Sequence, residues 1–162
     1  MNRVKFFIVS LALLLSPPVL SSGLKPFFEE SLATITKARE GEPFLLVLWS
    51  VDCPPCIKEL DLLRQVSVDY PELTFSLIST DTPDTAPEAR RILASHGLEN
   101  ADVWIFAHDY AERLRYRIDP DWFGELPRAY FYAADHQRLG VSGALEKEVL
   151  VEWAESVRKS GM

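Results

Sequence analysis

The sequence predicts an α/β domain with a central mixed, mostly parallel sheet and helices on both faces. Short apolar runs alternate with longer segments of helical periodicity, an order that is typical of parallel sheets. The run from Phe44 to Trp49 is apolar without interruption, as expected of a strand buried on both faces. Near the carboxyl end, two short strands separated by a turn predict an antiparallel hairpin at the sheet edge.

The first half of the chain predicts a helix, a strand and a second, longer helix. The first helix is expected to open at Pro26 and to end before Gly41. A strand from Phe44 to Ser50 follows. After it, apolar residues recur at three- and four-residue spacing, which predicts an amphipathic helix that ends near Tyr70-Pro71. The residues of this apolar stripe are Ile57, Leu60, Leu63, Val66 and Tyr70.

The middle of the chain predicts another strand and helix. Leu73 to Ser79 has the partial alternation of a strand, and Thr80 to Pro87 is expected to be a loop. Thr85-Ala86-Pro87-Glu88 has the spacing of a capping box. We therefore expect a helix that begins there, runs to His96 and ends at Gly97.

The remaining elements alternate in the same way. Val103 to Ala107 predicts a buried strand, and Asp109-Tyr110-Ala111-Glu112 has capping-box spacing for a short helix to about Ile118. Arg128 to Ala133 and Arg138 to Val141 predict the hairpin. The final helix is amphipathic, with an apolar stripe formed by Leu145, Val149, Leu150, Trp153, Ala154 and Val157.

Both cysteines of the chain lie between the second predicted strand and its helix, in Cys53-Pro54-Pro55-Cys56. Pro54 and Pro55 suit the first helical turn, where a backbone N–H has no intrahelical partner. Cys53 precedes that turn, so the free N–H groups and the helix dipole favour its thiolate, which is the nucleophilic form. Cys56 is close enough to close a disulfide, and the pair can cycle between dithiol and disulfide.

Other interpretations of a Cys-x-x-Cys pair are less favoured. A zinc site normally needs four ligands, but no second cysteine pair exists, and His96, His108 and His136 lack ligand spacing. An inert structural disulfide across so short a loop would contribute only about 2 kcal/mol. Haem attachment requires a histidine after the second cysteine, and Ile57 holds that position.

Length and charge restrict the class of protein. The 162 residues suffice for one domain, and 48% hydrophobic residues allow a substantial core. The formal net charge is −7, and no basic patch with interleaved aromatic residues is present. We therefore expect no nucleic-acid partner.

The N-terminus has the anatomy of a secretory signal peptide. Arg3 and Lys5 precede an apolar core from Phe6 to Leu15, and small residues follow up to Gly23. The apolar core is shorter than the roughly 20 residues that a membrane-spanning helix needs. We expect cleavage after Gly23, which divides the chain into a signal peptide (1–23) and a single mature domain (24–162).

Two motifs carry a resemblance to a known family. One is Trp49-x-x-x-Cys53-Pro54-Pro55-Cys56 after the buried strand, and the other is Leu126-Pro127 before the strand-hairpin-helix finish. Residues 25 to 160 resemble the thioredoxin superfamily, in particular its secreted TlpA-like thiol-disulfide oxidoreductases. The resemblance implies a thioredoxin-like fold, in which Asp81 to Asp119 would be an inserted strand-helix segment.

The resemblance also implies roles for individual residues. Cys53 would be the attacking cysteine and Cys56 the resolving one. Pro127 would follow a cis peptide bond and face the disulfide, which leaves the backbone of Leu126 free to pair with an extended substrate. Trp49, beside the disulfide, would help to shape the protein-docking surface together with Pro54, Pro55, Leu126 and Pro127. Without the resemblance, Pro127 would be an ordinary trans proline at the start of a strand.

The sequence departs from the thioredoxin pattern near the cysteines. Val47 stands where thioredoxin has a buried aspartate, so a proton acceptor for Cys56 must come from elsewhere, and Asp81 and Glu125 are candidates by neighbourhood only. Asp52 precedes Cys53, and its charge would raise the pKa of the thiol. Arg128 would act in the opposite sense if it reaches the sulfur.

The aromatic residues of the second half are expected to belong mainly to the core, because large apolar side chains are usually buried. Trp122 and Phe123 precede Leu126-Pro127 closely, so a place at the border of the docking surface is the alternative for these two. The residues concerned are Trp104, Trp122, Phe123, Tyr130 and Tyr132.

The function implied by these features is that of a periplasmic enzyme which exchanges disulfides with cysteine-containing proteins. It needs no cofactor and no metal. We expect it to act as a reductase of specific periplasmic proteins, kept reduced by a membrane electron donor. The alternatives are an oxidant that donates its disulfide, and a thioredoxin-fold chaperone or copper-handling module with the two cysteines as soft ligands.

Overall fold

A computed structural model of the chain describes residues 23–160. The predicted signal peptide therefore lies outside the described residues, apart from Gly23. The elements, in chain order, are β1 (Lys25–Phe27), α1 (Ser31–Lys37), β2 (Phe44–Trp49), α2 (Pro54–Asp69), β3 (Phe75–Ser79), the 3-10 turn η1 (Pro83–Thr85), α3 (Ala86–Ser95), β4 (Asp102–Phe106), α4 (Ala111–Ile118), β5 (Arg128–Tyr132), β6 (Arg138–Ser142) and α5 (Lys147–Ser160).

The strands form one mixed sheet in the order β1-β4-β3-β2-β5-β6. Neighbouring strands from β1 to β2 in this order pair in parallel, whereas β5 pairs antiparallel with both β2 and β6. The mostly parallel sheet with an antiparallel hairpin at one edge confirms the predicted fold class. β4, which belongs to the segment predicted as an insertion, lies between β1 and β3 in the sheet.

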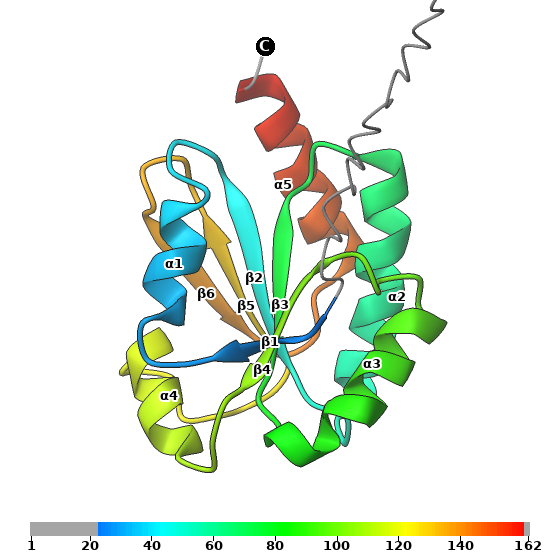
Figure 1. Cartoon of the computed structure of the whole chain (residues 1–162). Helices are drawn as coiled ribbons and strands as arrows, with labels where there is room; N and C mark the ends of the chain where they lie inside the picture. The colour runs from blue at the N-terminus through cyan, green and yellow to red at the C-terminus, as the bar shows by residue number, and fades with distance from the viewer. Residues whose placement is uncertain (1–22, 161–162) are drawn as a thin grey trace, which may run out of the picture.

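The central strand β2 divides the core into two layers because successive side chains point to opposite faces. Leu45, Val47 and Trp49 pack in one cluster with side chains of α2, α3 and α5. The alternate residues of β2 pack in the other cluster with α1 and α4. Figure 1 shows the two groups of helices on opposite sides of the sheet. The unbroken apolar run of β2 follows from this double burial.

The N-terminal region differs from the prediction. Residues Lys25–Phe27 form an edge strand that pairs with β4, and the first helix begins only at Ser31. Proline is tolerated in an edge strand because its missing N–H leaves no central ladder bond unmade. The Ser31 hydroxyl accepts a hydrogen bond from the Phe28 N–H at 2.8 Å. A strand of three residues is too short to show periodicity, which is why the prediction extended the helix over it.

The two predicted capping boxes do not form, although the helices that they announced do. Thr85 precedes α3 without a side-chain capping bond. Its hydroxyl instead donates to the carbonyl oxygen of Thr82 inside the preceding 3-10 turn. Tyr110, rather than Asp109, precedes α4, again without a side-chain cap. In α5, Val149 of the predicted stripe is 44% exposed, whereas Leu150 and Ala154 are buried.

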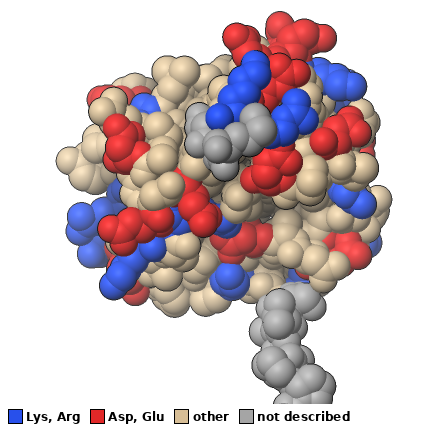
Figure 2. Space-filling view, turned by 90° about the horizontal axis from the view of Figure 1, so that it is seen from above, with Lys and Arg blue, Asp and Glu red and all other residues tan. Residues whose placement is uncertain are grey.

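The surface mixes charges of both signs. Figure 2 looks down on the end of the molecule that is uppermost in Figure 1, and acidic and basic side chains alternate there without a large patch of one sign. Among residues 23–160, no helix is both long and apolar enough to cross a membrane.

Candidate active site

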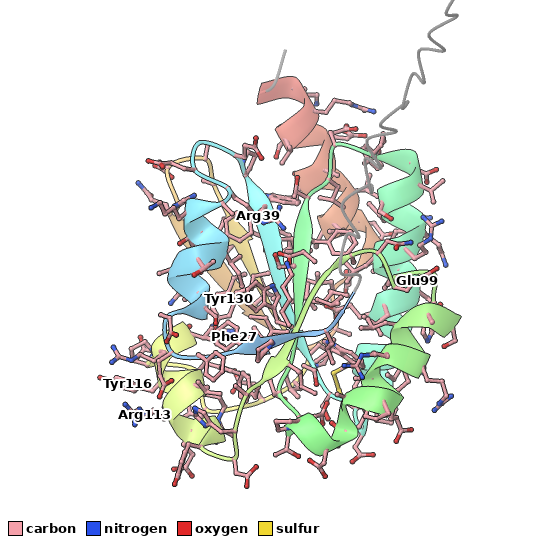
Figure 3. The ribbon with its side chains drawn as sticks, viewed as in Figure 1. Phe27, Arg39, Glu99, Arg113, Tyr116 and Tyr130 are labelled. Carbon is pink, nitrogen blue, oxygen red and sulfur yellow. A yellow bond between two sulfur atoms is a disulfide. The ribbon has the colours of Figure 1, made fainter. Side chains whose placement is uncertain are left out.

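The cysteine pair lies where β2 leads into α2, as predicted. Pro54 and Pro55 occupy the first turn of α2, and Cys53 is the residue that precedes the helix. Its sulfur accepts a hydrogen bond from the backbone N–H of Cys56, at 3.3 Å. Cys53 and Cys56 form a disulfide with their Cα atoms 5.2 Å apart, drawn as a yellow bond in Figure 3. The pair therefore spans the amino-terminal turn of α2, where free N–H groups favour a thiolate.

The two sulfurs differ in exposure. Cys56 is 1% exposed and belongs to the core cluster, whereas Cys53 is only partly buried against it. The asymmetry follows from the helix, because Cys56 lies on the face of α2 that packs on the sheet. A partner protein can therefore reach Cys53 but not Cys56.

Asp81 holds the loop that precedes Cys53. One carboxylate oxygen accepts from the Ser50 hydroxyl at 2.7 Å, and the other accepts from the Val51 N–H at 3.0 Å and the Ser79 hydroxyl at 2.5 Å. Both oxygens are thus engaged in joining the ends of β2 and β3. Asp81 positions the loop, an arrangement that leaves little capacity for the role of proton acceptor.

Leu126-Pro127 lies at the same end of the sheet as the cysteines. The peptide bond between these two residues is cis, as predicted. Arg128 at the start of β5 pairs with Leu48 near the end of β2, so Pro127 lies beside the last residue of β2. The carbonyl oxygen of Pro127 accepts from the Gly143 N–H at 2.9 Å, which joins this loop to the end of β6.

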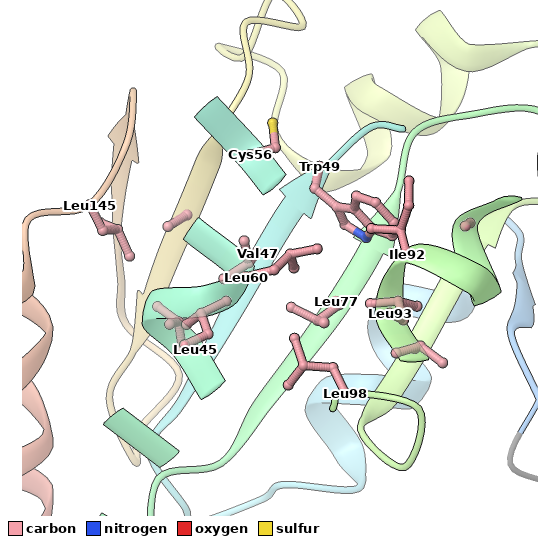
Figure 4. Close-up of a cluster of buried hydrophobic side chains, with 14 of the residues drawn as sticks. Leu45, Val47, Trp49, Cys56, Leu60, Leu77, Ile92, Leu93, Leu98 and Leu145 are labelled. Carbon is pink, nitrogen blue, oxygen red and sulfur yellow. The ribbon is translucent and has the colours of Figure 1, made fainter. Parts of the chain in front are cut away.

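Trp49 does not lie on the surface, which corrects the expectation that it shapes the docking surface directly. It is 1% exposed and packs in one cluster with Ile92 and Leu93 of α3, as Figure 4 shows. The alternation of β2 places it on the same face as Leu45 and Val47. Trp49 therefore supports the cysteine loop from within the core.

Glu59 is a candidate that the sequence interpretation missed. It lies three residues after Cys56, on the same buried face of α2, and it is 3% exposed. One carboxylate oxygen accepts from the Leu145 N–H at 3.1 Å, and the other has no partner. Burial raises the pKa of Glu59 to about 7, although the Leu145 N–H acts to lower it. The available signal was a glutamate inside the apolar stripe, directly before Leu60.

Unpartnered buried polar atoms concentrate around the site. Within residues 23–160, the buried side-chain nitrogen and oxygen atoms that lack a hydrogen-bond partner are Trp49 Nε1, Glu59 Oε1 and Arg128 Nε. These residues come from the end of β2, the second turn of α2 and the start of β5. Native proteins leave few such atoms, and each one calls for an explanation, such as a catalytic role or a bound water.

Arg128 belongs to a network around Asp119. Its guanidinium donates to Asp119 at 3.1 Å and to the Ser142 hydroxyl at 2.6 Å, and it lies 3.7 Å from Glu125. Tyr130 donates its hydroxyl to the same oxygen of Asp119, at 2.9 Å. Glu125 accepts from Ser142 at 2.6 Å. Both terminal nitrogens of the Arg128 guanidinium are therefore engaged, Nη1 by Ser142 and Nη2 by Asp119. An effect of its charge on the Cys53 thiolate stays a prediction.

The other predicted site residues lie close to the motif in the chain. The Asp52 side chain is exposed, and its backbone N–H donates to the Ser50 hydroxyl at 3.3 Å. Pro54 and Pro55 are exposed, whereas Leu126 is partly buried against both core clusters. In the described part of the chain, no group of three or more histidine, cysteine or acidic side chains is arranged to hold a metal ion.

No protein-family model and no curated protein matches the chain. Several solved structures are similar to the chain. A secreted disulfide oxidoreductase of Mycobacterium tuberculosis, homologous to E. coli DsbE, is similar with a TM-score of 0.59 at 23% identity, over 74% of this chain and 85% of that chain.

Two further solved structures are similar to this chain. A thiol:disulfide interchange protein of the thioredoxin family from Chlorobium tepidum has a TM-score of 0.61 at 15% identity, over 75% of this chain and 83% of that chain. StoA from Bacillus subtilis has a TM-score of 0.53 at 17% identity, over 70% of this chain and 83% of that chain. The fold of this chain is therefore thioredoxin-like, as the resemblance implied.

Proposed function

We propose that this protein is a periplasmic thiol-disulfide oxidoreductase of the TlpA-like type, acting through Cys53 and Cys56. One observation carries the proposal: the two cysteines close a disulfide across the first turn of α2 with only the first of them accessible. An accessible sulfur can attack or be attacked, and a buried neighbour can resolve the resulting mixed disulfide without meeting a second substrate. The similar solved structures include a secreted disulfide oxidoreductase and a thiol:disulfide interchange protein.

The reaction proceeds in two exchanges. The Cys53 thiolate attacks one sulfur of a substrate disulfide, so that a mixed disulfide forms and the other substrate sulfur leaves as a thiolate. Cys56 then loses its proton and attacks the Cys53 sulfur. This step forms the intramolecular disulfide and releases the second substrate thiolate. Two electrons pass from the protein to the substrate, and no dissociable cofactor takes part.

Glu59 is the proposed acceptor of the Cys56 proton. A general base works best when its pKa lies near the operating pH, and the pKa of Glu59 is about 7. The i, i+3 spacing places Glu59 on the helix face of Cys56, and its unpartnered oxygen can accept a proton. The Glu59→Gln variant should therefore slow the resolving exchange and remove its dependence on pH near 7, as measured by single-turnover kinetics at a series of pH values.

The proposed direction is reduction of specific cysteine-containing periplasmic proteins, with a membrane electron donor that returns the protein to its dithiol form. An oxidant needs a strongly stabilised Cys53 thiolate, because stabilising the reduced form raises the potential. The charge of Asp52 opposes that stabilisation, and the charge of Arg128 is compensated by Asp119. A potential near −270 mV against glutathione would support a reductant, and one near −120 mV would establish an oxidant instead.

Trapping tests the roles of the two cysteines. We expect Cys56→Ser to accumulate mixed disulfides through Cys53 and Cys53→Ser to accumulate none, as resolved on non-reducing gels. The opposite pattern would reverse the assignment. Titration of the reduced protein with Cu(I) separates the copper-handling alternative, because tight metal binding without insulin reduction would favour that class.

Export is tested separately from chemistry. The proposed signal peptide ends at Gly23, so the exported protein should begin at Leu24 and be recovered from the periplasm. Terminal sequencing decides the point, and an intact Met1 in the membrane fraction would show an anchored protein.

A further inference from the structure

The loop between α4 and β5, residues 119–127, is held at both ends. At its start, Asp119 accepts from Arg128 and Tyr130, at 3.1 and 2.9 Å. Near its end, the carbonyl oxygen of Glu125 accepts from the Trp122 indole at 2.9 Å. Trp122 itself is buried. The loop is therefore fixed by contacts that do not involve its most exposed residue.

That residue is Phe123, which is 90% exposed although its neighbour Trp122 is buried. This corrects the expectation that Phe123 belongs to the core. Gly124 follows with a φ of +99°, and a Cβ at this position would lie 3.2 Å from the Cδ of Arg115. The turn thus needs glycine and turns Phe123 outward. A large aromatic side chain on a fixed backbone loses little entropy when a partner covers it.

Phe123 borders a shallow pocket of about 260 Å³ on α4. We name this surface the aromatic platform, lined by Glu112, Arg115, Tyr116, Pro120, Trp122 and Phe123. Tyr116 is 64% exposed, and Figure 3 shows it and Arg113 pointing outward from α4. Aromatic residues and arginine are enriched among the residues that carry binding energy in protein interfaces.

The platform, whose own lining holds one arginine and one glutamate, lies on a basic helix of an acidic protein. Helix α4 holds three arginines and one glutamate, while the chain as a whole has a formal net charge of −7. Arg113 pairs with Glu29 at 2.9 Å. Within residues 23–160, no carboxylate lies within ion-pair distance of Arg115 or Arg117. Of these two residues, Arg115 lines the platform, and its charge is available to an acidic partner.

The platform lies close to the proposed substrate site along the chain. Phe123 precedes Pro127 by four residues, so at most about 14 Å of chain separates them. An extended polypeptide paired with Leu126 can therefore reach Phe123 within a few of its own residues.

We infer that the aromatic platform docks the protein substrate, an inference that rests on the proposed function. The platform binds an apolar side chain of the substrate that lies a few residues from the substrate cysteine and is flanked by acidic residues. Phe123 and Tyr116 contact the apolar side chain, and Arg115 pairs with an acidic neighbour. The platform thus selects among cysteine-containing proteins, whereas the cysteine pair itself accepts any accessible disulfide.

The test follows oxidation of the reduced protein by two disulfides. One is a short synthetic peptide with leucine and aspartates near its cysteine, which is linked to nitrothiobenzoate. The other is dithiobis(nitrobenzoate), which is too small to reach the platform. In both reactions the protein loses two electrons and its disulfide forms, while the probe is reduced to thiols. Released nitrothiobenzoate reports the rate.

We expect Phe123→Ala to slow the peptide reaction about tenfold, the effect of losing one central interface residue, and to change the small-probe rate less than about twofold. Arg115→Glu should slow the acidic peptide and speed a peptide with lysine in place of aspartate. The matched control is Val68→Ala, which removes a 61% exposed apolar side chain near the far end of α2. Its rates should equal those of the wild type.

Three results would overturn the inference. They are a wild-type peptide rate in Phe123→Ala, an equal loss with both probes, and sedimentation showing that Phe123 holds two copies of the chain together. Failure of the proposed function is distinct, because the wild-type protein would then react with the peptide no faster than dithiothreitol does.

Discussion

Glu59 and Asp119 are two carboxyl groups that lie near the candidate site, and their surroundings differ. Glu59 in α2 has one oxygen on the Leu145 N–H and the other without a partner. Asp119 also loses solvent, which acts to raise its pKa. However, hydrogen bonds from the Asp121 N–H and the Tyr130 hydroxyl, with two arginines, hold that pKa below its usual value. For Glu59, burial outweighs the hydrogen bond from the Leu145 N–H and raises the pKa to about 7.

The difference shows that partners, together with the depth of burial, decide the charge of a carboxyl group near the site. Asp119 stays charged and fixes the loop that carries Leu126-Pro127. Glu59 keeps one carboxylate oxygen without a partner, and we propose that it exchanges a proton with Cys56. Four changes test this contrast.

The largest effect is expected from Asp119→Ala. Removing the carboxylate leaves the Arg128 guanidinium, whose side chain is only 14% exposed, without its main counter-charge. Breaking such a pair costs about 3–5 kcal/mol of unfolding free energy. Urea unfolding measures it, with the exposed neighbour Asp121→Ala as control at less than about 0.5 kcal/mol. A small loss in Asp119→Ala would show that solvent replaces the carboxylate, and the contrast with Glu59 would fail.

The second effect concerns Glu59 and pH. Its pKa is about 7 in the folded protein, above the ordinary value of 4.5 that the unfolded chain has, so the folded state binds the proton more tightly. The contribution of this proton to the unfolding free energy is fully present below the pKa that Glu59 has in the unfolded chain. It is lost as the pH rises through the pKa of Glu59 in the folded protein. The unfolding free energy of the oxidised protein should thus fall by about 3 kcal/mol across that interval.

Glu59→Gln should lose that dependence, because an amide does not titrate. Urea unfolding at a series of pH values compares the two proteins. Parallel curves for the variant and the wild type would mean that Glu59 titrates normally and would remove its proposed role in proton transfer.

A smaller effect is expected from Gly140→Ala in β6. A Cβ there would clash with Nη2 of Arg128 and lie 2.9 Å from its Cζ, so the guanidinium that donates to Asp119 must shift. Crowding of this kind costs about 1–3 kcal/mol. The same change in the Asp119→Ala background should cost less, because the guanidinium is no longer held. Equal costs in both backgrounds would show that Arg128 moves without disturbing the network.

The smallest effect is expected from Tyr130→Phe. The variant removes the hydroxyl that donates to Asp119 but keeps the ring, which lies 4.7 Å from the Arg128 guanidinium carbon. Loss of one hydrogen bond costs about 1 kcal/mol. Thermal and urea unfolding measure it. A loss as large as that of Asp119→Ala would shift the main support of Asp119 from the arginines to the tyrosine.

The features that depend on local order could be predicted from the amino-acid sequence. The apolar run of β2 followed by Cys53-Pro54-Pro55-Cys56 placed the cysteine pair at a helix start, because prolines and helical periodicity act over neighbouring residues. The order of most strands and helices followed for the same reason. Leu126-Pro127 was found through its resemblance to a known motif rather than through any local pattern.

The features that depend on partners distant in the sequence became visible only in the folded chain. Lys25–Phe27 is a strand because β4 accepts it, far along the chain. Trp49 is buried because α3 covers it, and the one hydrogen bond of Glu59 comes from Leu145, which is remote in the sequence. Phe123 is exposed because contacts of Trp122 and Asp119 fix the loop around it. Burial and the available hydrogen-bond partners depend on segments that are remote in the sequence. The local periodicity of a segment therefore cannot predict them.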